Sequence, residues 1–130
     1  MTDNTTRRNL IAYRISEDGS YGPMNVRDDL AALQNAVRAE YIDIVGRCIG
    51  PERRSYAIVC DDVGGLNGRD VTAIHRNNPV LAGDLLVLRN GGEGDLESLT
   101  DDDLDYISCS MKKIWSYTDH VVVRSVLELV

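Results

Sequence analysis

The stretch Ser98-Leu99-Thr100-Asp101-Asp102-Asp103-Leu104 predicts the start of an α-helix. Thr100 is a preferred N-cap residue, and Asp103, three positions later, completes a capping box in its Asp form. Leu99 before the cap and Leu104 at the fourth helical position match a hydrophobic staple. The sequence therefore predicts a helix from this point onward. Its expected core face consists of Leu104, Ile107, Met111 and Ile114.

Another helix is expected earlier in the chain. Pro23 lies just upstream of it, and Asn25 is a good capping residue. Apolar side chains then recur at steps of four, three and four residues, at Val26, Leu30, Leu33 and Val37. This spacing gives one apolar stripe, which is typical of an amphipathic helix that covers a sheet.

Strand patterns occupy much of the remaining chain, because apolar side chains alternate with polar ones or form short apolar runs. The expected strands are 9–15, 41–49, 55–60 and 84–88. Residues 71–74 fit a short strand, and Asn77-Asn78-Pro79 indicates a break in the chain. The tail 121–130 fits a strand through its valines, although its apolar spacing fits a helix as well.

These elements predict an α+β fold with one mixed or mostly antiparallel sheet of roughly five to six strands. The two amphipathic helices are expected to pack on one face of that sheet. A length of 130 residues suits a single domain, and no linker divides it. We therefore expect one unit over 1–130, with 1–8 frayed.

Charge and hydropathy argue against several classes of protein. A formal net charge of −7 argues against direct binding to nucleic-acid phosphates and leaves basic protein surfaces as partners. The apolar runs fall far short of the roughly 20 residues that cross a bilayer, so no membrane association is expected. Met1 is followed by polar and basic residues instead of the apolar segment of a signal peptide. The expected location is the cytoplasm.

The cysteines and histidines do not have the spacing of a known catalytic or metal-binding motif. Cys48, Cys60 and Cys109 lack a CxxC pattern, which predicts three small buried residues and neither a disulfide framework nor a zinc site. His75 and His120 lie too far apart along the chain for a helical metal motif. We expect no catalytic residues, no metal and no cofactor.

Two glycine-rich segments suggest phosphate loops at first sight. The segment 64–68 is followed by Arg69 and Asp70, where a Walker loop needs Lys and then Ser or Thr. The segment 91–94 has acidic neighbours, which repel phosphate. Both are therefore interpreted as turns.

An acidic run surrounds the start of the later helix, and it allows two interpretations. As a functional surface it would dock a basic protein or mimic the phosphates of DNA; otherwise it is a solvated helix start, where carboxylates are favoured. Asp103 belongs to the run but is assigned to capping. The candidate partner-binding residues are Asp95, Glu97, Asp101, Asp102 and Asp105.

Several ordered stretches resemble the domain-of-unknown-function family numbered thirty-eight forty-six. They are LAAL at 30–33 leading to YIDIV at 41–45, GLNG at 65–68, NPVLAGDLLVL at 78–88 and SLTDDDL at 98–104. The resemblance covers about 26–115. It implies a small protein of bacteriophages, plasmids or conjugative elements, and it brings no catalytic residues.

Three functions follow as hypotheses. The leading one is a non-enzymatic accessory protein of a phage or mobile element that binds a host or phage protein. The second is an acidic inhibitor that mimics the charge of DNA, of the anti-restriction or anti-defence type. The third is a small-ligand binding module or an enzyme built on the 61–75 loop.

Overall fold

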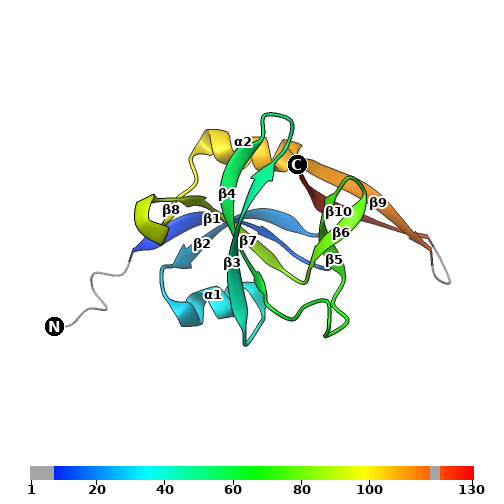
Figure 1. Ribbon diagram of the computed structural model, residues 1–130, viewed down its shortest axis with the longest axis horizontal. Coiled ribbons are helices and arrows are strands. Elements are labelled where there is room, and N and C mark those ends of the chain that lie inside the picture. The colour runs from blue at the N-terminus through cyan, green and yellow to red at the C-terminus, as the bar shows by residue number, and fades with distance from the viewer. Residues whose placement is uncertain (1–7, 118–120) are drawn as a thin grey trace.

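The protein consists of ten strands, two α-helices and a short 3-10 turn in the residues that the computed structural model describes, 8–117 and 121–130 (Figure 1). For 115–117 and 121–123 only the path of the backbone is described. In chain order the elements are β1 (Asn9–Ile15), β2 (Tyr21–Arg27), α1 (Leu30–Val37), β3 (Ile42–Ile49), β4 (Arg54–Asp61), β5 (Val71–His75), β6 (Asn78–Ala82), β7 (Leu85–Asn90), η2 (Gly92–Gly94), β8 (Leu96–Glu97), α2 (Asp101–Cys109), β9 (Met111–Tyr117) and β10 (Val121–Leu129). The predicted fraying of 1–8 falls outside the described residues except for Arg8, which donates to the Leu96 carbonyl at 2.8 Å.

All ten strands join one sheet. Its order is β2-β1-β7-β4-β3-β10-β5-β6, with β8 paired to β7 and β9 paired to β10. The sheet is mixed, because β10 runs parallel to β5 while the other pairs are antiparallel. A single residue pair, Ile49 with Leu129, joins β3 to β10. The sheet therefore has a narrow seam at this point.

Strands β1, β4 and β7 are buried on both faces, because their side chains alternate between two separate cores. In β4, Tyr56 and Ile58 lie in one core while Ala57 and Val59 lie in the other. β1 and β7 divide in the same way. Continuous apolar sequence in these strands therefore reflects burial on both sides.

The two helices lie on opposite faces of these central strands (Figure 1). Leu33, Ala36 and Val37 of α1 pack in one core, and Ile107 of α2 packs in the other. The expectation of five to six strands with both helices on one face is therefore wrong. Since each face of a fully apolar strand needs its own cover, the helices divide between the two faces.

The sheet curls beyond the seam, so that its far end covers the core on the α2 side. Ala73 of β5 and Leu127 of β10 share this core with Tyr13 of β1 and Ile58 of β4. Neither β5 nor β10 is next to β1 or β4 in the sheet order. The curl places the β5–β6 hairpin opposite β3 and the end of β4.

The capping box of α2 is confirmed, but the predicted length of this helix is wrong. The Thr100 side chain accepts from the Asp103 N–H, and the Asp103 carboxylate accepts from the Thr100 N–H. The helix ends at Cys109, and Met111 begins β9 instead of continuing the core face. Seven residue pairs between β9 and β10 satisfy its backbone, and this tertiary pairing overrides the helical spacing.

The start of α1 also differs from the prediction. Asp29, not Asn25, caps the helix by accepting from the Ala32 N–H at 2.8 Å. Val26 belongs to β2, where it is buried opposite Leu10.

Two further strand assignments follow from the structure. The tail is the strand β10, and the expected strand at 71–74 is confirmed as part of β5. The β9–β10 hairpin projects from the body in Figure 1.

The burial of Ile107, which is fully inaccessible, gives a stability prediction. Ile107→Ala removes buried methyl groups from the core under α2 and should lower the free energy of unfolding by about 2–5 kcal/mol. Leu104→Ala, at a partly buried position, should cost less. Urea unfolding measures both. Equal, small losses would contradict the assigned helix phase.

Candidate functional site

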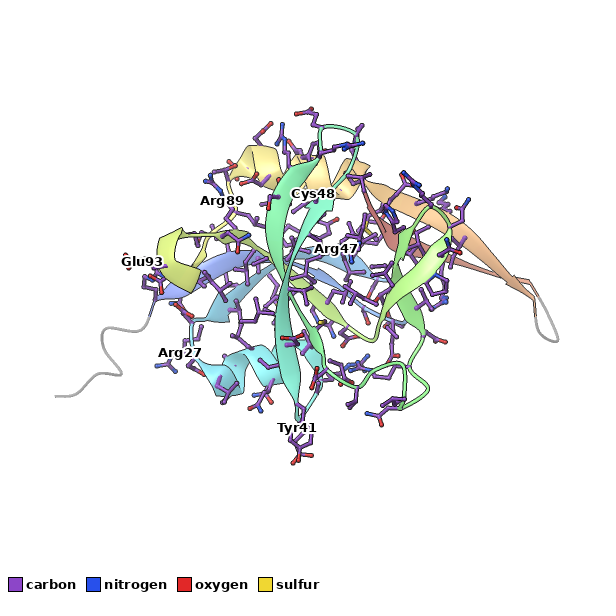
Figure 2. The ribbon with its side chains drawn as sticks, in the orientation of Figure 1. Arg27, Tyr41, Arg47, Cys48, Arg89 and Glu93 are labelled. Carbon is purple, nitrogen blue, oxygen red and sulfur yellow. The ribbon has the colours of Figure 1, made fainter. Side chains whose placement is uncertain are left out.

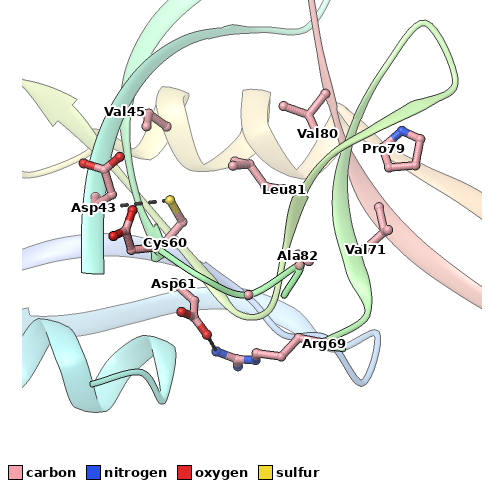
Figure 3. Close-up of a pocket in the computed structure, with 13 residues that line it drawn as sticks. Asp43, Val45, Cys60, Asp61, Arg69, Val71, Pro79, Val80, Leu81 and Ala82 are labelled. Atoms are coloured by element: carbon pink, nitrogen blue, oxygen red, sulfur yellow. Dashed lines mark hydrogen bonds and ion pairs between the residues drawn. The ribbon is translucent and has the colours of Figure 1, made fainter. Parts of the chain in front are cut away.

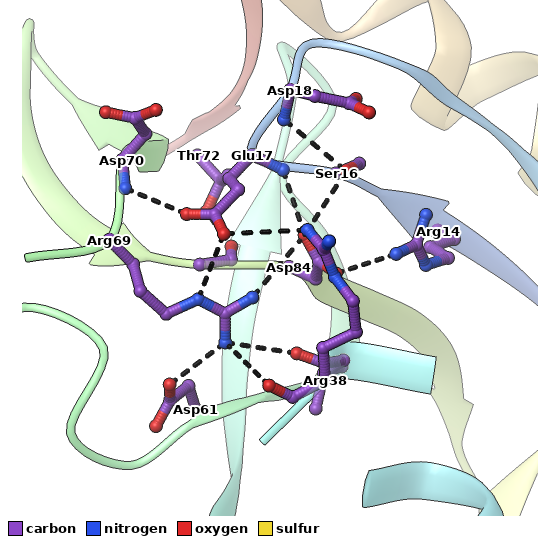
Figure 4. A network of polar contacts seen from close by, with 12 residues as sticks. Arg14, Ser16, Glu17, Asp18, Arg38, Asp61, Arg69, Asp70, Thr72 and Asp84 are labelled. Atoms are coloured by element: carbon purple, nitrogen blue, oxygen red, sulfur yellow. Dashed lines mark hydrogen bonds and ion pairs between the residues drawn. The ribbon is translucent and has the colours of Figure 1, made fainter. Parts of the chain in front are cut away.

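A buried carboxylate, Asp84, lies at the start of β7, beside the end of β1, where five segments meet (Figure 4). It stands between β6 and β7 and is fully inaccessible. Arg14 comes from β1, Arg38 from the end of α1, and Arg69 from the loop before β5. We call Asp84, these three arginines and Glu17 of the β1–β2 turn the Asp84 cluster.

The guanidiniums contact Asp84 at short range. Arg38 binds both carboxylate oxygens, with Nε at 2.6 Å from Oδ2 and Nη2 at 3.0 Å from Oδ1. Arg14 Nη2 lies 2.6 Å from Oδ2, and Arg69 Nη2 lies 3.6 Å from Oδ1. The Glu17 N–H also donates to Oδ1, at 3.0 Å. A buried carboxylate with this many donors is well satisfied.

The pKa of Asp84 reflects two opposing effects. Burial raises it, because a carboxylate in a low-dielectric site is costly. Hydrogen bonds from the Arg38 side chain and the Glu17 N–H, and the nearby positive charges, lower it by more. The net shift of the pKa is downward, so Asp84 is ionised at neutral pH.

Two of these arginines also bind the end of α1. Arg14 Nε donates to the Ala36 carbonyl at 2.8 Å, and Arg69 Nη1 donates to the Val37 carbonyl at 3.1 Å. These carbonyls belong to the last turn of the helix, where cations are favoured. The Asp84 cluster therefore fixes where α1 ends.

Arg69 links the Asp84 cluster to a pocket. Its Nη1 lies 2.9 Å from Asp61 Oδ2, and its Nε lies 3.3 Å from Glu17 Oε1. Gly83 makes room for this side chain, because a Cβ there would lie 2.8 Å from the guanidinium. Its φ of 87° is also in the region that favours glycine.

The pocket has a volume of about 400 Å³ and lies between β3, the end of β4, the turn after it and β6 (Figure 3). Asp43, Asp61, Asp62 and Arg69 supply its charged groups. The apolar wall consists of Val45, Val71, Pro79, Val80, Leu81 and Ala82. Gly64 and Gly65 form part of the rim. The arrangement combines an apolar wall with an excess of carboxylates.

Cys60 lines the pocket as a protonated thiol. It is buried, and its Sγ donates to the Asp43 carbonyl at 3.7 Å. Burial raises the pKa of the thiol to about 11, and the carboxylates of Asp43 and Asp62 add to this shift. A nucleophilic cysteine needs the opposite shift. The prediction of three buried cysteines is correct only for Cys60, because Cys48 is half-buried and Cys109 is exposed.

The residues of the acidic run lie on α2 and on the segment before it. Asp102 pairs with Arg54 at 2.8 Å, and Glu97 pairs with Arg8 at 3.3 Å. Asp95 follows the turn η2, and Asp101 and Asp105 are exposed on α2. The structure therefore brings Asp101, Asp102 and Asp105 onto one helix, and Asp95 and Glu97 lie apart from them. Their role in docking stays a prediction.

Other features considered in the sequence lie elsewhere. His75 Nδ1 lies 3.2 Å from the Leu129 carbonyl at the end of β5, and His120 falls outside the described residues. Within 8–117 and 121–130, three or more His, Cys, Asp or Glu side chains do not gather in a metal-binding group. Neither described helix is long and apolar enough to cross a bilayer.

Only part of the pocket is recognisable from the sequence. The 61–75 loop, named in the third hypothesis, supplies Asp61, Asp62, Gly64, Gly65, Arg69 and Val71 to its lining. Asp43, Cys60 and the wall from β6 were missed, because only the curl of the sheet brings β6 opposite β3. The strand β6 was also missed because a chain break was predicted at Asn77-Asn78-Pro79, whereas Asn78 and Pro79 begin this strand.

The architecture and the pocket define a mostly-sheet domain with a lateral pocket. A family model described as a domain of unknown function, DUF3846, matches residues 12–112. The chain belongs to this family, as the resemblance of its ordered motifs predicted. No curated protein and no solved structure matches the chain.

The Asp84 cluster gives a second stability prediction. Asp84→Asn leaves three guanidiniums without their buried counter-charge and should cost about 3–5 kcal/mol of unfolding free energy. The matched control is Asp70→Asn, which removes an exposed partner of Arg124 at 3.7 Å and should cost at most about 1 kcal/mol.

The pH dependence follows from the lowered pKa. The stabilisation from Asp84 is present above its ordinary pKa of 3.8 and is lost as pH falls through the lower folded value. The wild-type protein should lose this part of its stability in acid, whereas Asp84→Asn should show a flatter profile. Identical profiles from denaturant unfolding would contradict the cluster's role.

Proposed function

We propose that this protein is a non-enzymatic binding protein whose pocket receives a basic side chain of a partner protein. The observation that carries this proposal is the position of Asp43 and Asp62 at the pocket. Arg69 forms an ion pair with Asp61, whereas Asp43 and Asp62 form no ion pair with any of the described residues. The pocket therefore carries uncompensated negative charge.

A lysine or arginine side chain suits both parts of the pocket. Its apolar stem can pack on Val45, Val80 and Leu81, while its charged end reaches the carboxylates. Each exposed ion pair contributes little, about 0.2–1 kcal/mol, so the apolar contact has to supply much of the affinity.

Binding fits the chemistry of the pocket better than catalysis. Cys60 is protonated at neutral pH, and His75 contacts a backbone carbonyl away from the pocket lining. Neither arrangement resembles an activated nucleophile with an adjacent base. The Asp84 cluster is filled by its own ion pairs.

The resemblance to proteins of mobile elements suggests the setting. We expect the partner to be a host or phage protein in the bacterial cytoplasm. The alternative of an acidic DNA mimic has less support, because Glu97 and Asp102 already pair with arginines.

A titration followed by ¹⁵N–¹H spectra tests the proposal with a matched pair of ligands. Nα-acetyl-lysine amide should shift the amide signals of Val45, Gly64 and Gly65, since these residues line the pocket. Nα-acetyl-norleucine amide has nearly the same stem without the charge and should shift them much less.

The protein variants supply the second control. Asp43→Asn with Asp62→Asn should weaken lysine binding about tenfold, whereas Asp101→Asn with Asp105→Asn should leave it unchanged. Loss of binding only in the second variant would assign the site to the acidic run instead.

A further inference from the structure

We infer that β3 adds an extended strand of the partner at its open edge, with basic and apolar side chains in alternation. This inference rests on the proposed function and names the class of segment that the pocket receives. It comes from the backbone of β3, which the seam leaves without a full second neighbour. Figure 2 shows this strand between Tyr41 and Cys48.

The register shows which backbone groups face the open edge. The Asp62 N–H donates to the Tyr41 carbonyl, and antiparallel pairs alternate in their hydrogen bonding. Asp43, Val45 and Arg47 therefore bond to β4. Ile42, Ile44, Gly46 and Cys48 direct their N–H and C=O groups to the other side.

The end of β10 covers this edge only near Cys48 and Gly50. The Val130 N–H donates to the Cys48 carbonyl at 3.0 Å, and the Gly50 N–H donates to the Glu128 carbonyl at 3.4 Å. Among the described residues, no strand pairs with β3 on this side from Ile42 to Gly46. An added antiparallel strand would continue the β10–β3 ladder in the same register.

The two faces of this edge differ in chemistry. Asp43 and Val45 line the acidic pocket, while Ile42 and Ile44 line a groove beside α1. Asp28, Asp29 and Asp43 line this groove as well. Exposed Leu30, at 62% relative exposure, extends the apolar side of that groove. Side chains of an added strand alternate between these faces, since directly opposite residues share a face.

Asp43 protects the edge in the free protein. Its Oδ1 accepts from the Ile44 N–H at 2.9 Å, one of the groups that an added strand would use. A charged side chain at an open edge opposes pairing with arbitrary strands. An incoming carbonyl takes over the Ile44 N–H and releases the carboxylate, which then binds the basic side chain opposite it.

The segment that fits has a basic residue opposite Asp43 and apolar residues opposite Ile42 and Ile44. Main-chain hydrogen bonds provide affinity in such strand addition, and the alternating side chains provide specificity. The occupant is therefore an extended basic–apolar segment of a partner protein.

The test uses a fluorescein-labelled peptide, Ser-Val-Val-Lys-Val-Ser, and fluorescence anisotropy. In the continued register its lysine lies opposite Asp43 and its second valine opposite Ile44. N-methylation of the second valine removes a donor to β3 and should weaken binding about tenfold. N-methylation of the backbone nitrogen of the lysine is the matched control, because this N–H points away from β3. It should change binding by at most about twofold.

Two variants of Gly46 test the same edge from the protein side. A Cβ at this position meets no atom within 4 Å, and the Gly46 N–H faces the edge. Gly46→Pro should weaken peptide binding about tenfold with unchanged unfolding, and Gly46→Ala should bind normally. If Gly46→Pro fails to fold, the comparison of the two N-methylated peptides still tests whether the peptide adds as a strand.

The outcomes separate this inference from the proposed function. Equal binding of both N-methylated peptides, with a normal Gly46→Pro variant, overturns strand addition while leaving the pocket as a lysine site. Absence of lysine-dependent binding in every form overturns both. A dimer in sedimentation that Gly46→Pro dissociates identifies a second copy as the occupant and overturns the inference. About tenfold weaker binding on N-methylation of the second valine, and in Gly46→Pro, supports strand addition to β3.

Discussion

The buried carboxylate of Asp84, held by three guanidiniums, is the interaction on which the remaining architecture depends. An isolated ionised carboxylate in this position would be costly, so Arg14, Arg38 and Arg69 have to be in place together. Each comes from a different segment, and the same contacts fix the end of α1, the β1–β2 turn and the loop before β5. A chain that pairs its strands in another order would leave this charge uncompensated.

The Asp84 cluster also shapes the binding site, because its member Arg69 lines the pocket. Arg69 reaches from Asp84 to Asp61, and this bridge holds the loop that forms one side of the pocket. Because Arg69 already pairs with Asp61, Glu17 and Asp84, it does not neutralise Asp43 or Asp62. The position of Arg69 therefore stabilises the ion-pair network and also leaves the negative charge of the pocket unbalanced.

Much of the local structure was predictable from the sequence, and the tertiary arrangement was not. The Thr100–Asp103 capping box depends on residues three apart, which local patterns reveal. The predicted number of strands was too small because β2, β6, β8 and β9 were not expected. Pro23 and Pro79 were interpreted as a helix start and a chain break, but they lie in β2 and β6. These are the two ends of the sheet order, where proline is tolerated because one side of the strand needs no partner.

Amide hydrogen exchange along β3, measured by NMR in the unbound protein, tests most directly whether this edge is open. The N–H groups of Val45 and Arg47 bond to β4 and should exchange slowly, whereas those of Ile42 and Gly46 face the open edge and should exchange rapidly. This alternation from residue to residue is the predicted result. Uniform protection from Ile42 to Arg47 would show that the edge is already covered and would contradict the account.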